Sequence, residues 1–156
     1  MWRFALPGYS ATVGGMADDN VEVVRRSFEA IRNRDIDALL RLYEPDAEFR
    51  PLTGTRVESG GYHGHDGIRA YFDEVDTVWD QMLPHADDLR SHGALVVVVG
   101  GCMVRGRESG AETETPMAWV FHVRNGRVAS HRAFSDVDEA LSASGLGSGE
   151  RLENPS

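Results

Sequence analysis

The spacing of apolar residues changes near Pro84, and this change limits the chain to one fold class. Ahead of Pro84, apolar side chains recur at intervals of three and four residues, which predicts amphipathic helices. Beyond it, Val-rich and aromatic stretches are separated by turn residues, which predicts antiparallel strands. Helices grouped ahead of a meander of strands favour an α+β fold with helices packed on one face of a curved sheet.

Three helices are expected before the meander and one after it. The apolar stripes are Val21, Val24, Phe28 and Ile31 in the first, Ile36, Leu39, Leu40 and Tyr43 in the second, and Ile68, Tyr71, Phe72, Val75, Val78 and Trp79 in the third. Asp35 follows a tight turn and restarts the pattern for the second helix, which Pro45 is suited to end, and Asp66 is suited to cap the third helix. The closing helix is predicted over residues 136–144, with Gly145 at its end.

The predicted strands cover residues 47–51, 86–92, 94–105, 113–124 and 127–134. Asn125 and Gly126 separate the last two. An Asn-Gly pair between two strand-like stretches is typical of a two-residue β-hairpin turn.

The length of 156 residues fits one domain. We expect that domain at residues 20–146, between flexible tails at 1–19 and 147–156 that are rich in turn-forming and polar residues. The first tail lacks the apolar stretch of a secretory signal, and the strongly apolar run 94–99 is too short to cross a bilayer. The expectation is a cytoplasmic protein.

Charge and cysteine content exclude several classes of partner. With 16 Lys and Arg against 25 Asp and Glu, the formal charge is -9, which disfavours nucleic acid and anionic membranes. Cys102 is the one cysteine, so an intrachain disulfide is impossible. His63 and His65 lack a third ligand at a fixed spacing, and no Gly-rich phosphate loop stands in a strand-loop-helix setting. We therefore expect no metal and no organic cofactor.

Three segments carry a resemblance to a known superfamily. They are RNRDIDALLRLYEPDAEF, YHGHDGIRAYFDEV and WVFHVRNGRVASHRAFSDVDEAL. Their pattern and order resemble the nuclear transport factor 2-like superfamily and, within it, the SnoaL-like branch that includes polyketide cyclases. The resemblance covers residues 20–146 and implies a cone-shaped fold with one open mouth, and a homodimer. A fold that hosts many activities assigns none of them.

The resemblance also shows which known catalytic groups this chain lacks. Ketosteroid isomerases of this fold carry an acid at the position matching Ala118, a base at the one matching Pro51 and a tyrosine at the one matching Ser27. Limonene epoxide hydrolases carry an acid at the position matching Ala133. Alanine and proline transfer no protons, so neither activity is expected in its known form.

If the Asn-Gly turn sets the register of the last hairpin, the resemblance implies that Ala118 and Ala133 face the cone. Side chains alternate along a strand, so Glu114, Pro116, Val120 and His122 then share the face of Ala118, and His131 shares that of Ala133. His131 is the catalytic candidate, as an acid or base oriented by Glu114 or Asp88. Its alternative is a partly exposed strand residue near the mouth.

Aromatic side chains supply the candidate walls of a ligand pocket. The candidate ligand contacts are Tyr43, Phe49, Tyr62, Trp79, Val120 and His122, for each of which core packing is the alternative. In the same register Met117, Trp119, Phe121 and Val123 face away from the cone. So apolar a face predicts the interface of a homodimer.

Two classes of function remain open. The favoured one is a protein that holds a hydrophobic metabolite in a cone-shaped pocket without defined turnover. The alternative is a cofactor-independent cyclase, isomerase or hydratase that acts on a polyketide- or terpenoid-like substrate with His131 as acid or base.

Overall fold

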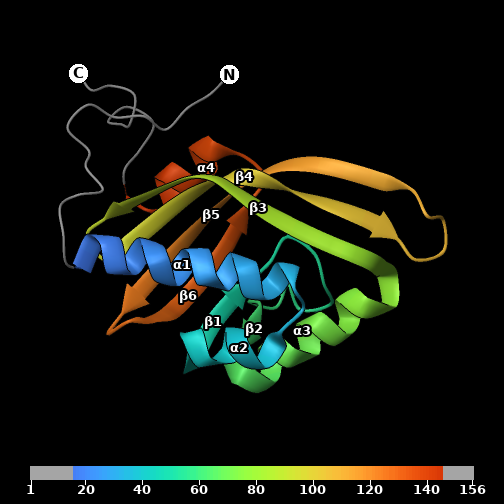
Figure 1. Ribbon diagram of the computed structural model, residues 1–156, viewed down its shortest axis with the longest axis horizontal. Helices are drawn as coiled ribbons and strands as arrows, with labels where there is room; N and C mark the ends of the chain where they lie inside the picture. The colour runs from blue at the N-terminus through green and yellow to red at the C-terminus, as the bar shows by residue number, and fades with distance from the viewer. Residues whose placement is uncertain (1–15, 146–156) are drawn as a thin grey trace.

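One six-stranded sheet organises residues 16–145, the part of the chain that the computed structural model describes (Figure 1). The strands are β1 (Tyr43–Arg50), β2 (Tyr62–His63), β3 (Trp79–His92), β4 (Leu95–Gly106), β5 (Glu112–Arg124) and β6 (Arg127–Phe134). Their order in the sheet is β2-β1-β6-β5-β4-β3, and neighbours run antiparallel except for β1 and β6, which are parallel. The predicted α+β fold is confirmed.

The helices cover both faces of this sheet. They are α1 (Met16–Arg32), α2 (Ile36–Leu42), α3 (Gly64–Val78) and α4 (Val137–Ala143). The first three pack with the large core cluster on one face, whereas α4 packs through Ala140 and Leu141 on the opposite face. The closing helix therefore departs from the expectation that all helices share one face. None of the described helices is long and apolar enough to cross a membrane.

Side-chain caps explain where two helices begin. The Asp35 carboxylate accepts a hydrogen bond from the Ala38 N–H at 3.1 Å and so caps α2. Asp136 caps α4 in the same way, accepting from the Glu139 N–H at 2.8 Å. The predicted cap at Asp66 is wrong, because the positive φ of Gly64 turns the chain into α3 two residues earlier.

Several elements begin earlier than the sequence pattern predicts. Strand β1 starts at Tyr43 instead of residue 47, so Pro45 lies inside β1 and does not end α2. Helix α1 starts at Met16, so residues 16–19 are helical rather than part of a tail, and the rest of the two predicted tails lies outside the described residues. Strand β3 starts at Trp79 and continues through Pro84. A proline is tolerated there because β3 is an edge strand, whose outward N–H groups have no partner strand.

The hairpin between β5 and β6 contains the predicted turn and an unpredicted bulge. Asn125 and Gly126 have φ values of 54° and 78°, as the two-residue turn requires. The register then shifts, since Val123 pairs with Val128 but His122 pairs with Ser130, which leaves Ala129 as an extra residue on β6.

The shift places Ala133 opposite Trp119 instead of Ala118. A slip of one residue exchanges the two faces of a strand. The face assignment predicted for β5 is therefore wrong along its length.

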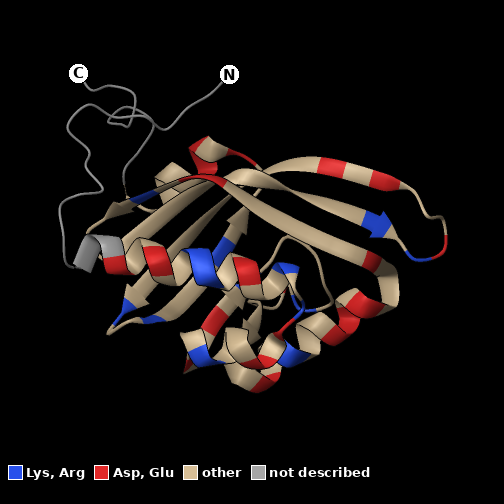
Figure 2. Ribbon diagram, viewed as in Figure 1, with Lys and Arg blue, Asp and Glu red and all other residues tan. Residues whose placement is uncertain are grey.

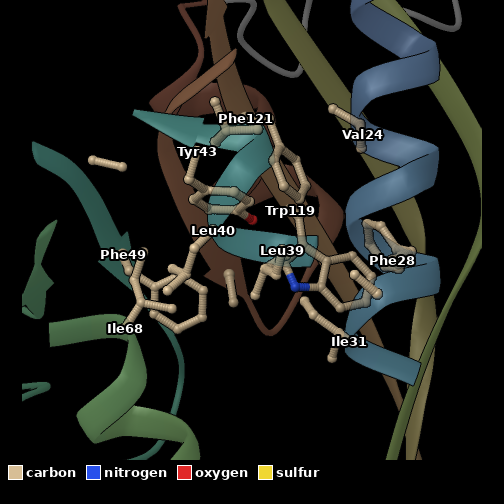
Figure 3. Close-up of a cluster of buried hydrophobic side chains, with 14 of the residues drawn as sticks. Val24, Phe28, Ile31, Leu39, Leu40, Tyr43, Phe49, Ile68, Trp119 and Phe121 are labelled. Carbon is tan, nitrogen blue, oxygen red and sulfur yellow. The ribbon is translucent and has the colours of Figure 1, made fainter. Parts of the chain in front are cut away.

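The side chains expected at a dimer interface belong to the core of the single chain. Figure 3 shows Val24, Phe28 and Ile31 of α1 facing Trp119 and Phe121 of β5. The rings of Phe28 and Trp119 meet edge to face, with centroids 4.8 Å apart. The argument for a homodimer through this face is wrong because α1 covers it. The homodimer itself stays a prediction.

Phe121→Ala tests the corrected face of β5. Phe121 is fully buried, so its truncation should lower the free energy of unfolding by about 3–5 kcal/mol. Chemical denaturation at two protein concentrations a hundredfold apart measures this loss. The same loss of unfolding free energy is expected at both concentrations. A loss that grew on dilution would show that Phe121 lies in a dimer interface.

Candidate functional site

The inner face of the sheet, together with α1, α3 and the loop after β1, lines a cavity of about 300 Å³. Its wall residues are mostly aromatic or aliphatic. They include Phe28 and Ile31 of α1, Tyr71 and Phe72 of α3, Met117 and Trp119 of β5, and Ala133 of β6. None of the lining residues that the structure describes is Asp, Glu, Lys or Arg. Its volume lies at the small end of the range for ligand pockets.

His131 lies in the wall of this cavity, on the inner face of β6, where the sequence analysis expected it. Its ring packs between Phe49 and Phe121, with centroid distances of 4.4 and 4.5 Å, and is 4% exposed. Burial lowers the pKa of His131 to about 3. The imidazole is therefore neutral at physiological pH.

Tyr43 is a hydrogen-bond partner of the His131 ring. Its hydroxyl and Nδ1 of His131 share a hydrogen bond of 2.5 Å, which leaves Nε2 as the ring nitrogen for a ligand. Tyr43 also bonds to Ser27, whose hydroxyl donates to the Val23 carbonyl at 3.0 Å. Burial raises the pKa of Tyr43, so it stays a neutral phenol. This polar chain ties α1 to β6 and fixes the orientation of the imidazole.

The other polar groups of the wall are also uncharged near neutral pH. Burial raises the pKa of the Cys102 thiol to about 11. Burial also raises the pKa of Tyr71, which has a hydroxyl contact of 3.9 Å to the sulfur of Met82. Thr113 and Thr115 line the β5 side. The cavity thus offers hydrogen-bonding groups without a formal charge.

Comparison with known proteins agrees with this geometry. Residues 24–131 match the SnoaL-like domain. The chain belongs to this SnoaL-like domain family. A comparison with curated proteins finds no match.

Solved structures similar to this SnoaL-like protein share its fold. An NTF2-like protein of unknown function from Burkholderia pseudomallei superposes with a TM-score of 0.68 at 27% identity, covering 80% of this chain and 95% of that one. TerC, co-crystallised with polyporic acid, gives 0.67 at 24% identity, covering 87% and 99%. A proposed polyketide cyclase from Xanthomonas campestris gives 0.68 at 14% identity, covering 81% and 96%.

The structure separates the residues predicted for the site into three groups. Phe49 and Trp79 line the cavity with His131. Tyr43 and Tyr62 are fully buried but lie outside the cavity wall, and the Tyr62 hydroxyl donates to Glu74 at 2.7 Å.

The third group lies on the opposite face of the sheet. It comprises Glu114, Val120 and His122, whose predicted inward position is wrong because of the bulge at Ala129. Asp88 is also on that face, since it pairs with Val99, which packs towards α4. Neither carboxylate can orient His131.

Glu114 instead forms an ion pair on the outer face of the sheet. Its carboxylate lies 2.6 Å from Nε2 of His85, and Asp87 lies 2.9 Å from Nδ1 of the same ring. The His85–Glu114 pair crosses β4 at Gly101. A Cβ atom added to Gly101 would lie only 2.5 Å from the Glu114 carboxylate. Burial lowers the pKa of His85, but the hydrogen bonds that the ring donates to Glu114 and Asp87 outweigh it and raise the pKa overall.

Sequence reasoning missed the β5 contribution to the cavity wall. Thr113, Thr115, Met117 and Trp119 line it. A hairpin with the two-residue turn and no bulge would place these four side chains on the outer face. The bulge at Ala129 places them on the inner face, and an alanine at this position gives no sign of a bulge in the sequence.

His131→Gln tests the neutral imidazole. The folded state holds the ring neutral down to about pH 3, whereas the unfolded chain protonates it near pH 6.5. Folding therefore loses about 1.4 kcal/mol per pH unit from this residue as the pH falls below 6.5. Denaturant unfolding between pH 5 and 6.5 should show a shallower pH dependence in the variant. Equal slopes would contradict a buried neutral His131.

Glu114→Gln tests the outer-face pair. The raised pKa of His85 means that this pair stabilises the fold below pH 6.5 and that the stabilisation is lost as the pH rises through the folded pKa. The variant should lower the melting temperature at pH 5.5 and have a smaller effect at pH 9. Glu112→Gln is the matched control, because Glu112 lies 3.6 Å from Arg105, which stays charged at both pH values. A decrease in melting temperature of Glu114→Gln that is equal at both pH values would refute the His85–Glu114 ion pair.

Proposed function

We propose that this SnoaL-like protein binds an uncharged, hydrophobic small molecule in the cavity and releases it unchanged. The observation that carries the proposal is the composition of the wall. Among residues 16–145 the wall is mostly apolar and aromatic, with no Asp, Glu, Lys or Arg, and it contains one imidazole that burial keeps neutral. An ionised ligand would lose its hydration without gaining a counter-charge, so the wall selects against it.

The polar groups of the wall define the rest of the ligand. Nε2 of His131 and the hydroxyls of Thr113 and Thr115 are the groups that can orient a bound molecule. A suitable ligand has a flat apolar body and at least one hydrogen-bonding group. A cavity of about 300 Å³ holds roughly ten waters, which such a body would displace.

A second candidate function is cofactor-independent cyclisation, isomerisation or hydration on a polyketide- or terpenoid-like substrate. The His131–Tyr43 hydrogen bond favours it, because an oriented imidazole in a cavity wall is the arrangement a general acid or base needs. Two observations oppose it. A pKa of about 3 makes His131 a weak base at pH 7, and no carboxylate of the described part of the chain lines the cavity. Binding without turnover is therefore the better-supported function.

Cys102 provides a direct readout of cavity occupancy. It is the one cysteine of the chain, and its thiol lines the cavity. We expect the neutral fluorophore N-phenyl-1-naphthylamine to bind with a rise in fluorescence. At saturation it should slow modification of Cys102 by N-ethylmaleimide at pH 8.5 at least about fivefold, because the occupied cavity excludes the reagent.

Two variants on opposite faces of the sheet control this experiment. Ala133→Leu adds volume inside the cavity and should abolish both binding and protection. Val120→Ala removes a similar volume from the outer face and should bind the probe like the original chain. Absence of probe binding, or binding that leaves the Cys102 rate unchanged, would refute ligand binding in the cone.

A further inference from the structure

We propose that this protein has a second binding site, on the outer face of the sheet, which takes a small oxyanion such as a carboxylate or a phosphate. Its centre is a pair of arginines, Arg50 at the end of β1 and Arg132 on β6. The side chains of His131 and Ala133 line the cavity, and side chains alternate along a strand, so Arg132 between them points to the opposite face of the sheet.

The register of the strands brings the two guanidinium groups to one face. Arg50 and Arg132 are direct partners in the β1–β6 pair, and Arg132 is in turn the partner of Val120 on β5. Val120 packs against α4, so this row lies on the outer face. Like charges directly opposite one another on neighbouring strands destabilise a sheet.

Neither arginine forms an ion pair with a carboxylate among the residues whose side chains the structure describes. Every ion pair found there uses another cation, and Arg132 instead stacks on the ring of Phe134, with its Cζ 4.7 Å from the centroid. Two adjacent arginines that form no ion pair are unexpected in a chain with a net charge of -9. An oxyanion between them would turn the repulsion into attraction.

The arginines border a hollow of about 340 Å³ that contains further donors. The next row of the sheet contributes Ser130 and His122, which are direct partners, so a hydroxyl and an imidazole lie beside the guanidinium groups. Glu48 is the one carboxylate of this hollow. The two arginines outnumber it, and their planar forks match carboxylate and phosphate oxygens in pairs.

A second groove extends from the same arginines towards α4. It is lined there by Asp136, Asp138 and Glu139. The Asp136 carboxylate caps α4, and Glu139 accepts from the Ser135 hydroxyl at 3.4 Å. These acids repel an oxyanion from the α4 side, so the anion belongs on the β5–β6 side, next to Ser130 and His122.

Thermal unfolding at constant ionic strength tests the site, with sodium chloride replaced stepwise by sodium phosphate or sodium citrate at pH 7. A ligand that binds only the folded state raises the melting temperature in proportion to its occupancy. We expect at least one oxyanion to stabilise the protein saturably and its apparent Kd to rise about tenfold or more in Arg50→Gln and in Arg132→Gln. A response to phosphate alone assigns a phosphate site, and a response to citrate alone assigns a carboxylate site.

Arg127→Gln is the matched control, since it removes the same charge from the other end of β6. It should keep the full response, including the general stabilisation by excluded anions that every variant retains. Titration calorimetry with citrate and with phosphate at 25 °C measures the same affinities without unfolding.

If the glutamine variants do not fold, Arg50→Lys and Arg132→Lys replace them. A several-fold loss is then expected, because lysine lacks the paired donors. The site is refuted if neither oxyanion binds, or if the responses of the Arg50 and Arg132 variants equal that of Arg127→Gln.

Discussion

The packing of α1 on β5 depends on one extra residue in β6. Ala129 bulges out of the hairpin and brings Trp119 opposite Ala133. Trp119 and Phe121 on the inner face of β5 then contact Phe28, and these contacts pack α1 against the sheet. Without the bulge, Ala118 and Val120 would face α1, and large aromatic rings would face α4. The position of the core and the wall of the cavity both follow from this local irregularity.

A buried polar chain sets the character of the cavity. Val23, Ser27, Tyr43 and His131 link α1 to β6 through hydrogen bonds within an aromatic surrounding. Buried polar groups are tolerated when they are paired, and here the pairing also fixes the imidazole in one orientation. Burial that keeps His131 neutral removes the one titratable side chain of the wall that could carry charge near pH 7. The same burial therefore favours binding of uncharged molecules and disfavours proton transfer.

Most of the fold could be predicted from the sequence, because helix and strand periods and the Asn-Gly turn are local signals. The position of His131 could also be predicted. It lies two residues before Ala133 on the same strand, and the bulge at Ala129 does not fall between them. The positions of Glu114, Val120 and His122 were inferred across the hairpin, and the bulge reversed each of them. Trp79 was assigned to a helix by its period, yet it lines the cavity from the start of β3. Inference along one strand is thus safer than inference between strands.

The sheet separates two electrostatic environments. Charged positions lie along α1 and α3 and near the end of the β4–β5 hairpin (Figure 2), and the outer face carries the His85–Glu114 pair and the two arginines of β1 and β6. The cavity wall on the inner face, as far as the structure describes it, has no ionised side chain near neutral pH. Changes in pH or salt near physiological conditions therefore act on the outer face and leave the inner wall unaltered. Affinity for an uncharged ligand in the cone would stay constant under conditions that change what the outer face binds.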